Sequence, residues 1–241
     1  MNNKDFEKTL VAFTDGSSLG NPGPGGWGAV LVSPRIGEVI ELGGSKPQTT
    51  NNEMELTAIV SILSYAVNNT EPLHIFTDSQ YAINGITKWV HGWVKNGWKT
   101  KDGQAVKNMF LFKTMHELVN ERGVEKVHWH HVRGHVGVPG NERVDDIARW
   151  FAEGQDVPLY RGNLVDYDIQ NIMSFEVDQQ AQAKKTSKGK AAYSYLSLID
   201  GILEKHSTWT DCEARVKGNK AKFKKALSAD HEQEIMNEWG V

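Results

Sequence analysis

The sequence predicts two folded parts, an α/β domain with a five-stranded mixed sheet flanked by helices and a small ββαβα module near the C-terminus. Over residues 1–164, short apolar runs alternate with segments of helical apolar periodicity, after an opening group of three strands. Residues 165–190 then carry few apolar side chains after Phe175, a composition typical of a flexible tether. Beyond this tether, apolar runs on both sides of Asp200 and Gly201 indicate a hairpin with a two-residue turn.

Five apolar runs predict the strands of the first part. They cover residues 10–14, 27–32, 39–43, 73–77 and 124–132. The first three follow one another through turns that contain Gly-Pro and Pro-Arg-Ile-Gly, so we expect them to form a meander. Helical segments separate the last two, which indicates a mixed sheet.

Helical periodicity of apolar residues predicts helices over residues 53–67, 79–94, 108–122 and 141–153. In the small module, we expect strands at 193–199, 202–206 and 221–226. Thr210 and Ser228 are expected to cap its two helices, the second of which runs to Trp239. These elements divide the chain into a domain at 1–162, a linker at 163–190 and a module at 191–241.

Composition and charge exclude several classes of protein. The 241 residues contain one cysteine, Cys212, so neither an intramolecular disulfide framework nor a cysteine-based metal cluster is expected. The N-terminus is polar and no apolar run is long enough to span a membrane, so we expect a soluble, cytoplasmic protein. The net charge of −3 provides no overall attraction for nucleic acid, although residues 184–225 hold 11 basic and 4 acidic side chains. A nucleic-acid partner must therefore be bound by local basic patches.

Two predicted strands end in an aspartate. Asp15 follows the apolar run at 10–14, and Asp78 follows the run at 73–77. Ligands of α/β sheets gather at the carboxyl ends of the strands, so these two carboxylates are expected to converge there. The alternative is turn chemistry, because Asp before Gly or Ser commonly caps a turn or a helix.

Glu55 and Asp145 are two further candidates, both on helices. Glu55 lies on the apolar stripe of its helix, and a carboxylate that faces a core must be paired, neutralised or bound to a cation. Asp145 shares a face with Ala148 and Ala152, although its neighbour Asp146 and a simple dipole role in the first helical turn are alternatives. If these carboxylates meet, an oxygen-only site suits Mg²⁺ or Mn²⁺, and two such ions about 3.5–4 Å apart can drive a phosphoryl displacement.

Five motifs give the chain a resemblance to a known family. They are TDGS at residues 14–17, GNPGPGGWG at 20–28, TNNEMEL at 50–56, TDSQY at 77–81, and GH at 134–135 followed by PGNERVD at 139–145. In this order and spacing, from about residue 8 to residue 155, the chain resembles type 1 ribonuclease H. The resemblance implies the ribonuclease H-like fold. It also implies an endoribonuclease that hydrolyses the RNA strand of RNA/DNA hybrids and leaves 5′-phosphate and 3′-hydroxyl ends.

The same resemblance assigns catalytic roles to particular residues. It implies that Asp15, Glu55, Asp78 and Asp145 bind two Mg²⁺ ions, with Mn²⁺ as an alternative. It also implies that His135 lies on a mobile loop and assists proton transfer or product release. A glycine-rich loop that carries a side chain titrating near neutrality is compatible with that role.

Histidines 128, 130 and 131 form a second cluster of candidate ligands. A zinc site needs ligands that converge in tetrahedral geometry, whereas successive residues of a strand point to opposite faces. We therefore interpret these histidines as residues on alternating faces of a strand and expect no zinc site.

Positions that match the family's motifs imply the contacts to the substrate. Discrimination of RNA from DNA requires contacts to 2′-hydroxyl groups. The resemblance nominates Asn21, Asn52 and Gln80 for contacts to sugars and base edges. Thr50 and Asn51 are expected to contact the substrate from the loop that also holds Asn52, and capping of the following helix is the alternative role of that loop.

Residues 87–107 interleave aromatic and basic side chains. This pattern suits a ridge that follows phosphates, and it is similar to the basic protrusion of the family. The ridge residues expected to contact the substrate are Trp89, Trp93, Lys95, Trp98 and Lys99. The alternative is an amphipathic helix whose tryptophans are mostly core, which the spacing of Trp89 and Trp93 favours for that pair.

The basic C-terminal module resembles the small hybrid-binding, viroplasmin-like domain that is attached to some ribonucleases H. The resemblance rests on Trp209, Cys212, VKG at 216–218 and AKFK at 221–224. It implies a surface for RNA/DNA hybrid or double-stranded RNA, made of Trp209, Lys217, Lys220, Lys222, Phe223 and Lys224. A solvated lysine-rich surface or a protein-interaction module is the alternative.

Two other functions are compatible with parts of this pattern. One is a metal-dependent DNA nuclease of the same fold, similar to an integrase, against which the His135 loop and the ridge argue. The other is a non-catalytic nucleic-acid-binding protein, whose signature would be the loss of a carboxylate, and all four are present. We therefore expect a metal-dependent hydrolase that acts as a monomer on RNA/DNA hybrid.

Overall fold

The computed structural model describes residues 6–132, 137–169, 171–174, 193–199, 201–219, 221–226 and 228–240. The chain forms two compact units, Met1–Gln179 and Gln180–Val241. Each unit is described by itself. In the part of the chain that the structure describes, no helix has the length and apolar character that crossing a membrane requires.

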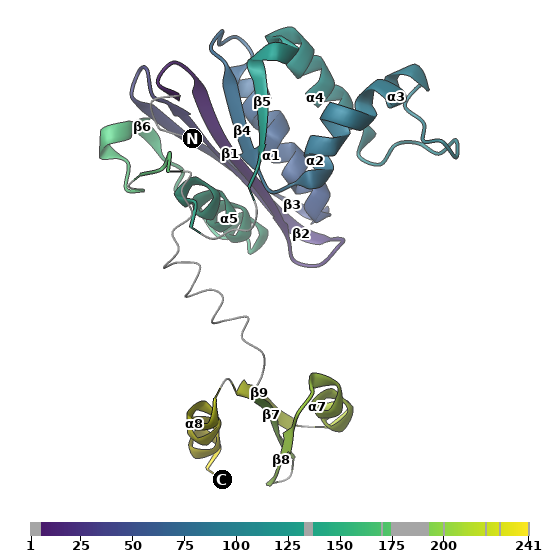
Figure 1. The fold of residues 1–241 in the computed structure, drawn as a ribbon, viewed down its shortest axis with the longest axis vertical. Helices are drawn as coiled ribbons and strands as arrows, with labels where there is room; N and C mark the ends of the chain where they lie inside the picture. Colours follow the sequence, from purple (N-terminus) through teal and green to yellow (C-terminus); the bar gives the residue numbers. More distant parts are fainter. Residues whose placement is uncertain are drawn as a thin grey trace. The chain divides into compact units, whose positions relative to one another are not determined.

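The first unit is built on a six-stranded mixed sheet with the strand order β5-β4-β1-β2-β3-β6 (Figure 1). Strands β1 (Leu10–Ser18), β2 (Gly23–Ser33) and β3 (Glu38–Thr49) form the expected antiparallel meander. Strands β4 (Leu73–Thr77) and β5 (Val127–His131) add in parallel on the other side of β1. The five predicted strands are therefore confirmed, and the mixed sheet follows from the helical connections before β4 and β5.

Two details of this sheet differ from the prediction. A sixth strand, β6 (Arg161–Asn163), pairs antiparallel with β3, so the prediction of five strands was one too few. Residues 124–126, expected to begin β5, form a short 3₁₀ helix instead.

Helices cover both faces of the sheet (Figure 1). Helices α1 (Asn51–Ala66) and α4 (Met109–Arg122) pack on one face around an apolar core, and α5 (Pro139–Ala152) packs on the other. The predicted helix 79–94 consists of α2 (Gln80–Asn84), a π-helical turn (Gly85–Trp89) and α3 (Val90–Lys95). The helices therefore lie where the apolar periodicity placed them, within a few residues.

Helix α5 lies unusually close to the sheet because glycines face it. A Cβ atom on Gly26 would overlap the carbonyl oxygen of Ala148 and the backbone of Ala152, and one on Gly28 would overlap the carbonyl oxygen of Val144. The glycines of the GNPGPGGWG motif thus allow the helix backbone to approach β2 directly. This close approach fixes the distance between α5 and the sheet.

Substituting Ala for Gly26 is therefore expected to lower the free energy of unfolding by about 1–3 kcal/mol, because α5 must move outward to admit one methyl group. Gly92 in α3 is the matched control, because nothing lies within 4 Å of the position its Cβ would take. Gly92→Ala should be neutral or slightly stabilising, since Ala favours helix. Chemical denaturation measures both, and an equal response of the two variants would contradict the close-approach explanation.

The first unit extends beyond the expected boundary at residue 162. A short 3₁₀ helix (Leu164–Asp166) follows β6, and Tyr167 and Ile172 are buried in the core on the α5 side of the sheet. Residues 163–169 and 171–174, which the sequence assigned to the linker, therefore belong to this unit. Residues 175–192 lie outside the described part of the chain.

The second unit has the predicted ββαβα order. Its elements are β7 (Ser194–Ile199), β8 (Ile202–His206), α7 (Trp209–Val216), β9 (Ala221–Ala226) and α8 (Ala229–Trp239), with β7 at the centre of the three-stranded sheet. Ser228 caps α8 as predicted, but α7 is capped by Thr208 and not by Thr210. The Thr208 hydroxyl oxygen accepts a hydrogen bond from the Asp211 amide at 3.2 Å, which places the start of the helix two residues earlier.

Candidate active site

Four acidic residues, supplied by four different parts of the chain, lie at one end of the strands of the first sheet. Asp15 lies on β1 and Asp78 directly follows β4, its parallel neighbour, so both strands deliver a carboxylate to the same edge. Glu55 lies in the second turn of α1, and Asp145 lies on α5. Asp15 does not end its strand as predicted, because β1 continues beside β2 to Ser18. The parallel pairing of β1 with β4 ends at Phe13 and Phe76, so Asp15 and Asp78 still come out at the same end of that pair.

Electrostatics shows that these four carboxylates are neighbours. Burial, which leaves Asp15 only 3% exposed, and repulsion from Asp78, Asp145 and Glu55 raise the pKa of the Asp15 carboxyl to about 8. A hydrogen bond from the Gly16 amide to Asp15 Oδ1, at 2.7 Å, opposes this shift without overcoming it. The site therefore concentrates negative charge around one buried acid.

Two polar side chains hold the carboxylate of Glu55. Asn51 Nδ2 donates to Glu55 Oε1 at 2.7 Å, and the Ser79 hydroxyl donates to Glu55 Oε2. Ser79 also caps α2, so Glu55 is tied to the segment that carries Asp78. Glu53, in contrast, forms an ion pair with Lys46 at 2.5 Å and takes no part in this cluster.

The structure also distinguishes Asp145 from its neighbour on α5. Asp145 is close enough to Asp15 to raise the pKa of that buried carboxyl. The Asp146 carboxylate instead forms an ion pair with Arg149 at 2.5 Å. Of the two candidates, Asp145 is therefore the one that belongs to the cluster.

A histidine that sequence reasoning did not connect with the site lies beside Asp78. Nε2 of His131 is 3.2 Å from the Asp78 carbonyl oxygen. Strand register was the available signal, because His131 ends β5 opposite Thr77, the residue directly before Asp78. His135 falls outside the described residues.

His128 and His130 share the opposite face of β5. Their rings stack against His74 of β4, and His74 Nδ1 lies 2.9 Å from His130 Nε2. Burial and repulsion from the other two imidazoles lower the pKa of His74 to about 4. The alternation of faces that the sequence predicted for His128, His130 and His131 is thus present. The stacked rings on one face are those of His74, His128 and His130.

The expected substrate contacts lie in segments that also carry the carboxylates. Thr50 caps α1 through its hydroxyl oxygen, and Asn51 and Asn52 form the first turn of that helix, before Glu55. Gln80 is exposed two residues after Asp78, and Asn21 is exposed in the loop after β1. Residues 50–52 therefore form the start of the helix that carries Glu55, and Thr50 has the capping role that was the alternative to a substrate contact.

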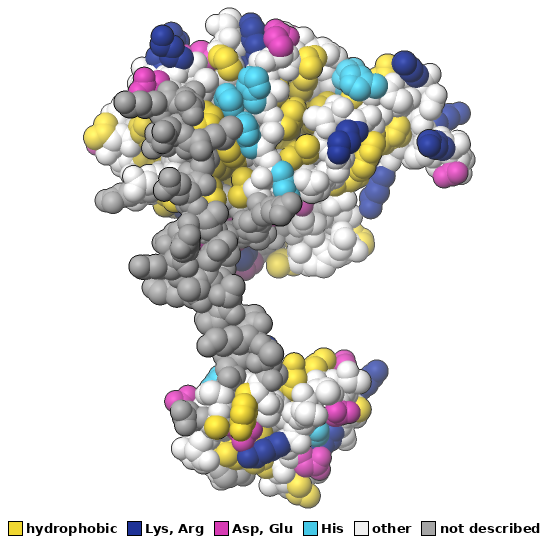
Figure 2. Space-filling model, viewed as in Figure 1, with side chains coloured by type: hydrophobic (Ala, Val, Ile, Leu, Met, Phe, Trp, Pro, Cys, Tyr) yellow, Lys and Arg dark blue, Asp and Glu magenta, His cyan; other side chains and the backbone are white. Residues whose placement is uncertain are grey.

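The predicted ridge is a protrusion of α3 and the loop that follows it. Figure 2 shows Lys and Arg side chains spread over this protrusion, and Lys95 and Lys99 are exposed. Trp93 packs against Phe112 of α4 and Trp98 lies beneath the ammonium group of Lys113, so both support the protrusion. Trp89 is 40% exposed and remains accessible to a ligand.

Two hydrophobic rings stand exposed on the second unit. Trp209 and Phe223 are 40% and 50% exposed, and their rings lie 5.6 Å apart. The two lysines next to Phe223 point to the other face of the sheet. Lys224 forms an ion pair with Glu238 of α8, and Lys222, two residues away on the strand, points to the same face as Lys224. Lys217 is exposed after α7, and Lys220 lies outside the described residues. The structure therefore separates the predicted aromatic and basic residues of β9.

The donor set of the carboxylate cluster suits a hard divalent cation. Its candidate ligands are carboxylate oxygens, which hard divalent cations prefer. Burial and the neighbouring carboxylates, which raise the pKa of Asp15, disfavour negative charge there in the absence of a cation. Within the described ranges, no three His, Cys, Asp or Glu side chains are gathered closely enough to hold an ion as they stand.

Comparison with known proteins agrees with this geometry. Residues 7–153 match the RNase H family. The chain is 48% identical over 161 residues to the ribonuclease H of Rhizobium etli, which covers 66% of this chain and 99% of that protein. It is 49% identical over 139 residues to the ribonuclease H of Acidovorax sp., which covers 58% of this chain and 91% of that protein.

A solved structure extends the comparison to the fold. The crystal structure of a type 1 RNase H with the type 2 active-site motif superposes with a TM-score of 0.56 and is 30% identical in sequence. The superposition covers 68% of this chain and 82% of that one. Because the sequence match spans more than half of the chain and all four elements that carry the carboxylates, the chain belongs to the RNase H family.

Proposed function

We propose that the first unit is an endonuclease that hydrolyses the RNA strand of RNA/DNA hybrids, with divalent metal ions held by Asp15, Glu55, Asp78 and Asp145. The observation that carries this proposal is the cluster of four carboxylates around one buried acid, which four separate elements supply. Such a cluster raises the energy of the ion-free protein, and structural needs alone do not explain it.

Mg²⁺ is the expected ion, with Mn²⁺ as an alternative and two ions at each site. Bound Mg²⁺ supplies an activated water and stabilises the leaving oxygen in phosphodiester hydrolysis. The P–O3′ bond of the RNA breaks, so the products carry a 5′-phosphate and a 3′-hydroxyl. Asn51 and Ser79 contribute by fixing the direction in which the Glu55 carboxylate points.

Recognition of RNA is assigned to polar side chains on segments that also carry carboxylates. Asn21 follows β1, Asn52 lies at the start of α1 and Gln80 follows Asp78, and their donors and acceptors suit 2′-hydroxyl groups and base edges. Thr50 and Asn51, also at the start of α1, are proposed as further contacts.

The test is cleavage of labelled RNA/DNA hybrid, double-stranded RNA and double-stranded DNA of one sequence, with Mg²⁺ and with EDTA. We expect cleavage of the RNA strand of the hybrid only, and none in EDTA. Equal cleavage of double-stranded DNA would favour the DNA-nuclease alternative, and binding of hybrid without any cleavage would favour a non-catalytic protein.

The α3 protrusion provides a prediction with an internal control. Trp89→Ala removes an exposed ring and should raise the KM for hybrid on the order of tenfold with little change in stability. Trp93→Ala removes a ring that packs against Phe112 and should lower the free energy of unfolding by about 3 kcal/mol. Steady-state kinetics and thermal unfolding separate the two effects. Loss of stability without a rise in KM in the Trp89 variant would assign that ring to the core.

For the second unit, we propose binding of a nucleic-acid duplex through Trp209 and Phe223. Trp209→Ala in the full-length chain should raise the KM for long hybrids several-fold and leave kcat unchanged, because a tethered binding unit raises the local substrate concentration. Lys224→Ala is the matched control, since that side chain is engaged with Glu238 on the other face. Tighter binding of double-stranded RNA than of hybrid would change the ligand assigned to this unit, and equal KM values for all three proteins would remove its binding role.

A further inference from the structure

A buried acid on β3 forms a second polar centre on the α5 side of the sheet. The side chain of Glu41 has no exposed surface and accepts four hydrogen bonds. Arg143 of α5 donates from Nε to Oε1 at 2.6 Å and from its terminal nitrogen to Oε2 at 2.8 Å. The Tyr167 hydroxyl donates to Oε1 at 2.5 Å, and the Tyr160 amide donates to Oε2 at 2.9 Å. The carboxylate is therefore saturated by donors from two separate segments.

The hydrogen bonds of Glu41 attach β3 to α5, the helix that carries Asp145. Val144 is fully buried and faces the sheet. Successive residues of a helix are about 100° apart, so Arg143 and Asp145 lie on opposite flanks of Val144. One flank is held at β3 through Glu41, and the other places Asp145 near Asp15 on β1. Rotation of α5 about its axis would therefore move Asp145 relative to the other carboxylates.

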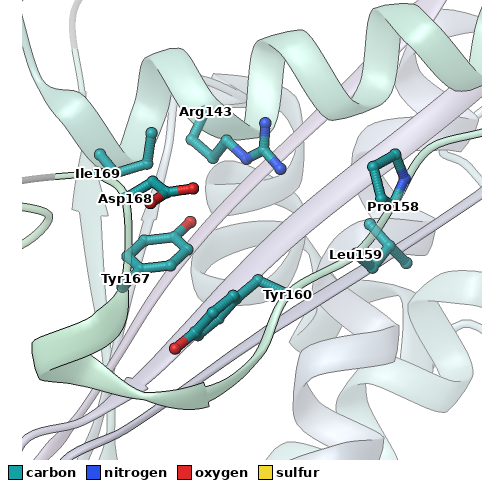
Figure 3. Close-up of a pocket in the computed structure, with 7 residues that line it drawn as sticks. All are labelled: Arg143, Pro158, Leu159, Tyr160, Tyr167, Asp168 and Ile169. Carbon is teal, nitrogen blue, oxygen red and sulfur yellow. The ribbon is translucent and has the colours of Figure 1, made fainter.

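The segment after α5 supplies the other two hydrogen bonds to Glu41. Figure 3 shows that the hydroxyl group of Tyr167 points toward Arg143, whereas that of Tyr160 points away. The Tyr160 hydroxyl donates instead to the carbonyl oxygen of Asn163 at 2.7 Å. The two tyrosine rings, 4.9 Å apart, form part of the wall of a cavity of about 350 Å³. Tyr167 also packs in the apolar core on the α5 side of the sheet. Its bond to Glu41 adds a polar link from this segment to β3 and, through Arg143, to α5.

We propose that Tyr167 is a positioning residue, which acts through Glu41 and Arg143 to fix the rotation of α5 and thereby the placement of Asp145 beside Asp15. This inference rests on the proposed function, because it assumes that the four carboxylates bind divalent ions. Tyr167 lies beyond residue 153, where the match to the RNase H family ends. The segment after the family domain thus takes part in forming the metal site.

A loss of positioning differs from a loss of stability in what it changes. Tyr167→Phe keeps the buried ring and leaves Glu41 with three of its four donors, so the fold is retained. Without the hydroxyl bond, the Glu41–Arg143 pair is held less firmly and α5 gains freedom to rotate. Binding an ion must then restrict this freedom as well as gather the carboxylates, and that cost lowers the affinity for the ion. The affinity for hybrid, which other segments bind, should be unaffected.

The experiment measures Mn²⁺ binding without substrate, from the electron paramagnetic resonance signal of free Mn²⁺, in the full-length protein. Tyr167→Phe is expected to weaken Mn²⁺ binding about tenfold. It should also raise the Mg²⁺ concentration that gives half-maximal cleavage, with an unchanged KM for hybrid and with kcat restored at high Mg²⁺. Arg143→Lys, which keeps the charge but loses the two-pronged contact, should act in the same direction. Tyr160→Phe is the matched control and should bind Mn²⁺ as the unsubstituted protein does.

Each result decides the question. Unchanged Mn²⁺ affinity in Tyr167→Phe, or an equal loss in Tyr160→Phe, overturns the inference and leaves the proposed function intact. A lower unfolding temperature with unchanged Mn²⁺ binding also overturns it, since that is the mark of a purely structural residue. If the unsubstituted protein neither binds Mn²⁺ nor cleaves hybrid, the proposed function fails and this inference fails with it.

Discussion

Asp15→Asn is expected to reduce the cleavage of hybrid by about a thousandfold or more while making the ion-free protein more stable. Activity falls because the buried carboxylate at the centre of the cluster is lost. Stability rises because the pKa of Asp15 is about 8 in the folded protein against 3.8 in a model peptide. Between about pH 4 and pH 8 in EDTA, the Asp15 carboxyl is therefore protonated in the folded protein and ionised in the unfolded chain.

The sign of this linkage gives a measurable slope. A raised pKa stabilises the protein at low pH, and that contribution is lost as the pH rises toward 8. Asn does not titrate, so the variant should be free of this loss and gain on the order of a few kcal/mol at pH 8 in EDTA, at about 1.4 kcal/mol per pKa unit. Addition of Mg²⁺ should stabilise the unsubstituted protein more than the variant. Thermal unfolding across pH, with EDTA and with Mg²⁺, measures all of these effects.

Asp146→Asn is the matched control, because it makes the same chemical change on α5 at a residue paired with Arg149. It should retain activity and show no gain in stability in EDTA. If Asp15→Asn were no more stable than the unsubstituted protein in EDTA, the raised pKa that burial and the neighbouring carboxylates give Asp15 would be refuted. If Asp146→Asn were inactive, the role in the cluster assigned to Asp145 would belong to Asp146.

Glu41→Ala is expected to have the largest effect on stability, a loss of about 3–5 kcal/mol. It leaves the guanidinium group of Arg143, whose side chain is 18% exposed, without its anionic partner, and the Tyr167 hydroxyl without its acceptor. Glu53→Ala removes an acid from a more exposed ion pair with Lys46 and should cost about 0–1 kcal/mol. Urea denaturation at neutral pH compares them. A similar loss of unfolding free energy in the two variants would show that the buried Glu41 ion pair stabilises the fold no more than the exposed Glu53 pair does.

The elements of the first unit were predictable where an apolar pattern repeats. Strand β4 was predicted with its observed bounds because it is a continuous apolar run in the sheet interior. Strand β6 could not be found in this way, because Arg161, Gly162 and Asn163 carry no pattern and become a strand only by pairing with β3. Tyr167 and Ile172 precede a long polar stretch, and the predicted linker was extended back over them although their segment holds several apolar residues.

The candidate site was predictable to the extent that motifs name residues. The positions of Asp15, Glu55 and Asp78 follow from strand ends and a helical face, and the structure brings the three together. The resemblance named Asp145 and not Asp146, and the structure supplies the physical difference, because Asp146 is paired with Arg149 three residues along α5. Glu41 lies in no motif, and its role appears only when β3, α5 and the segment after α5 are seen in contact.

The four carboxylates are far apart along the chain, and this separation bears on the order of synthesis and folding. A nascent chain that has emerged through β4 already carries Asp15, Glu55 and Asp78, but the last carboxylate arrives only with α5. The central strand β1 must also wait for β4 before it gains its parallel neighbour, and such long-range pairing forms late in folding. If the four carboxylates act together as proposed, a chain that ends before α5 should not cleave hybrid. Cleavage of hybrid should then report that the first unit has been made and folded through α5.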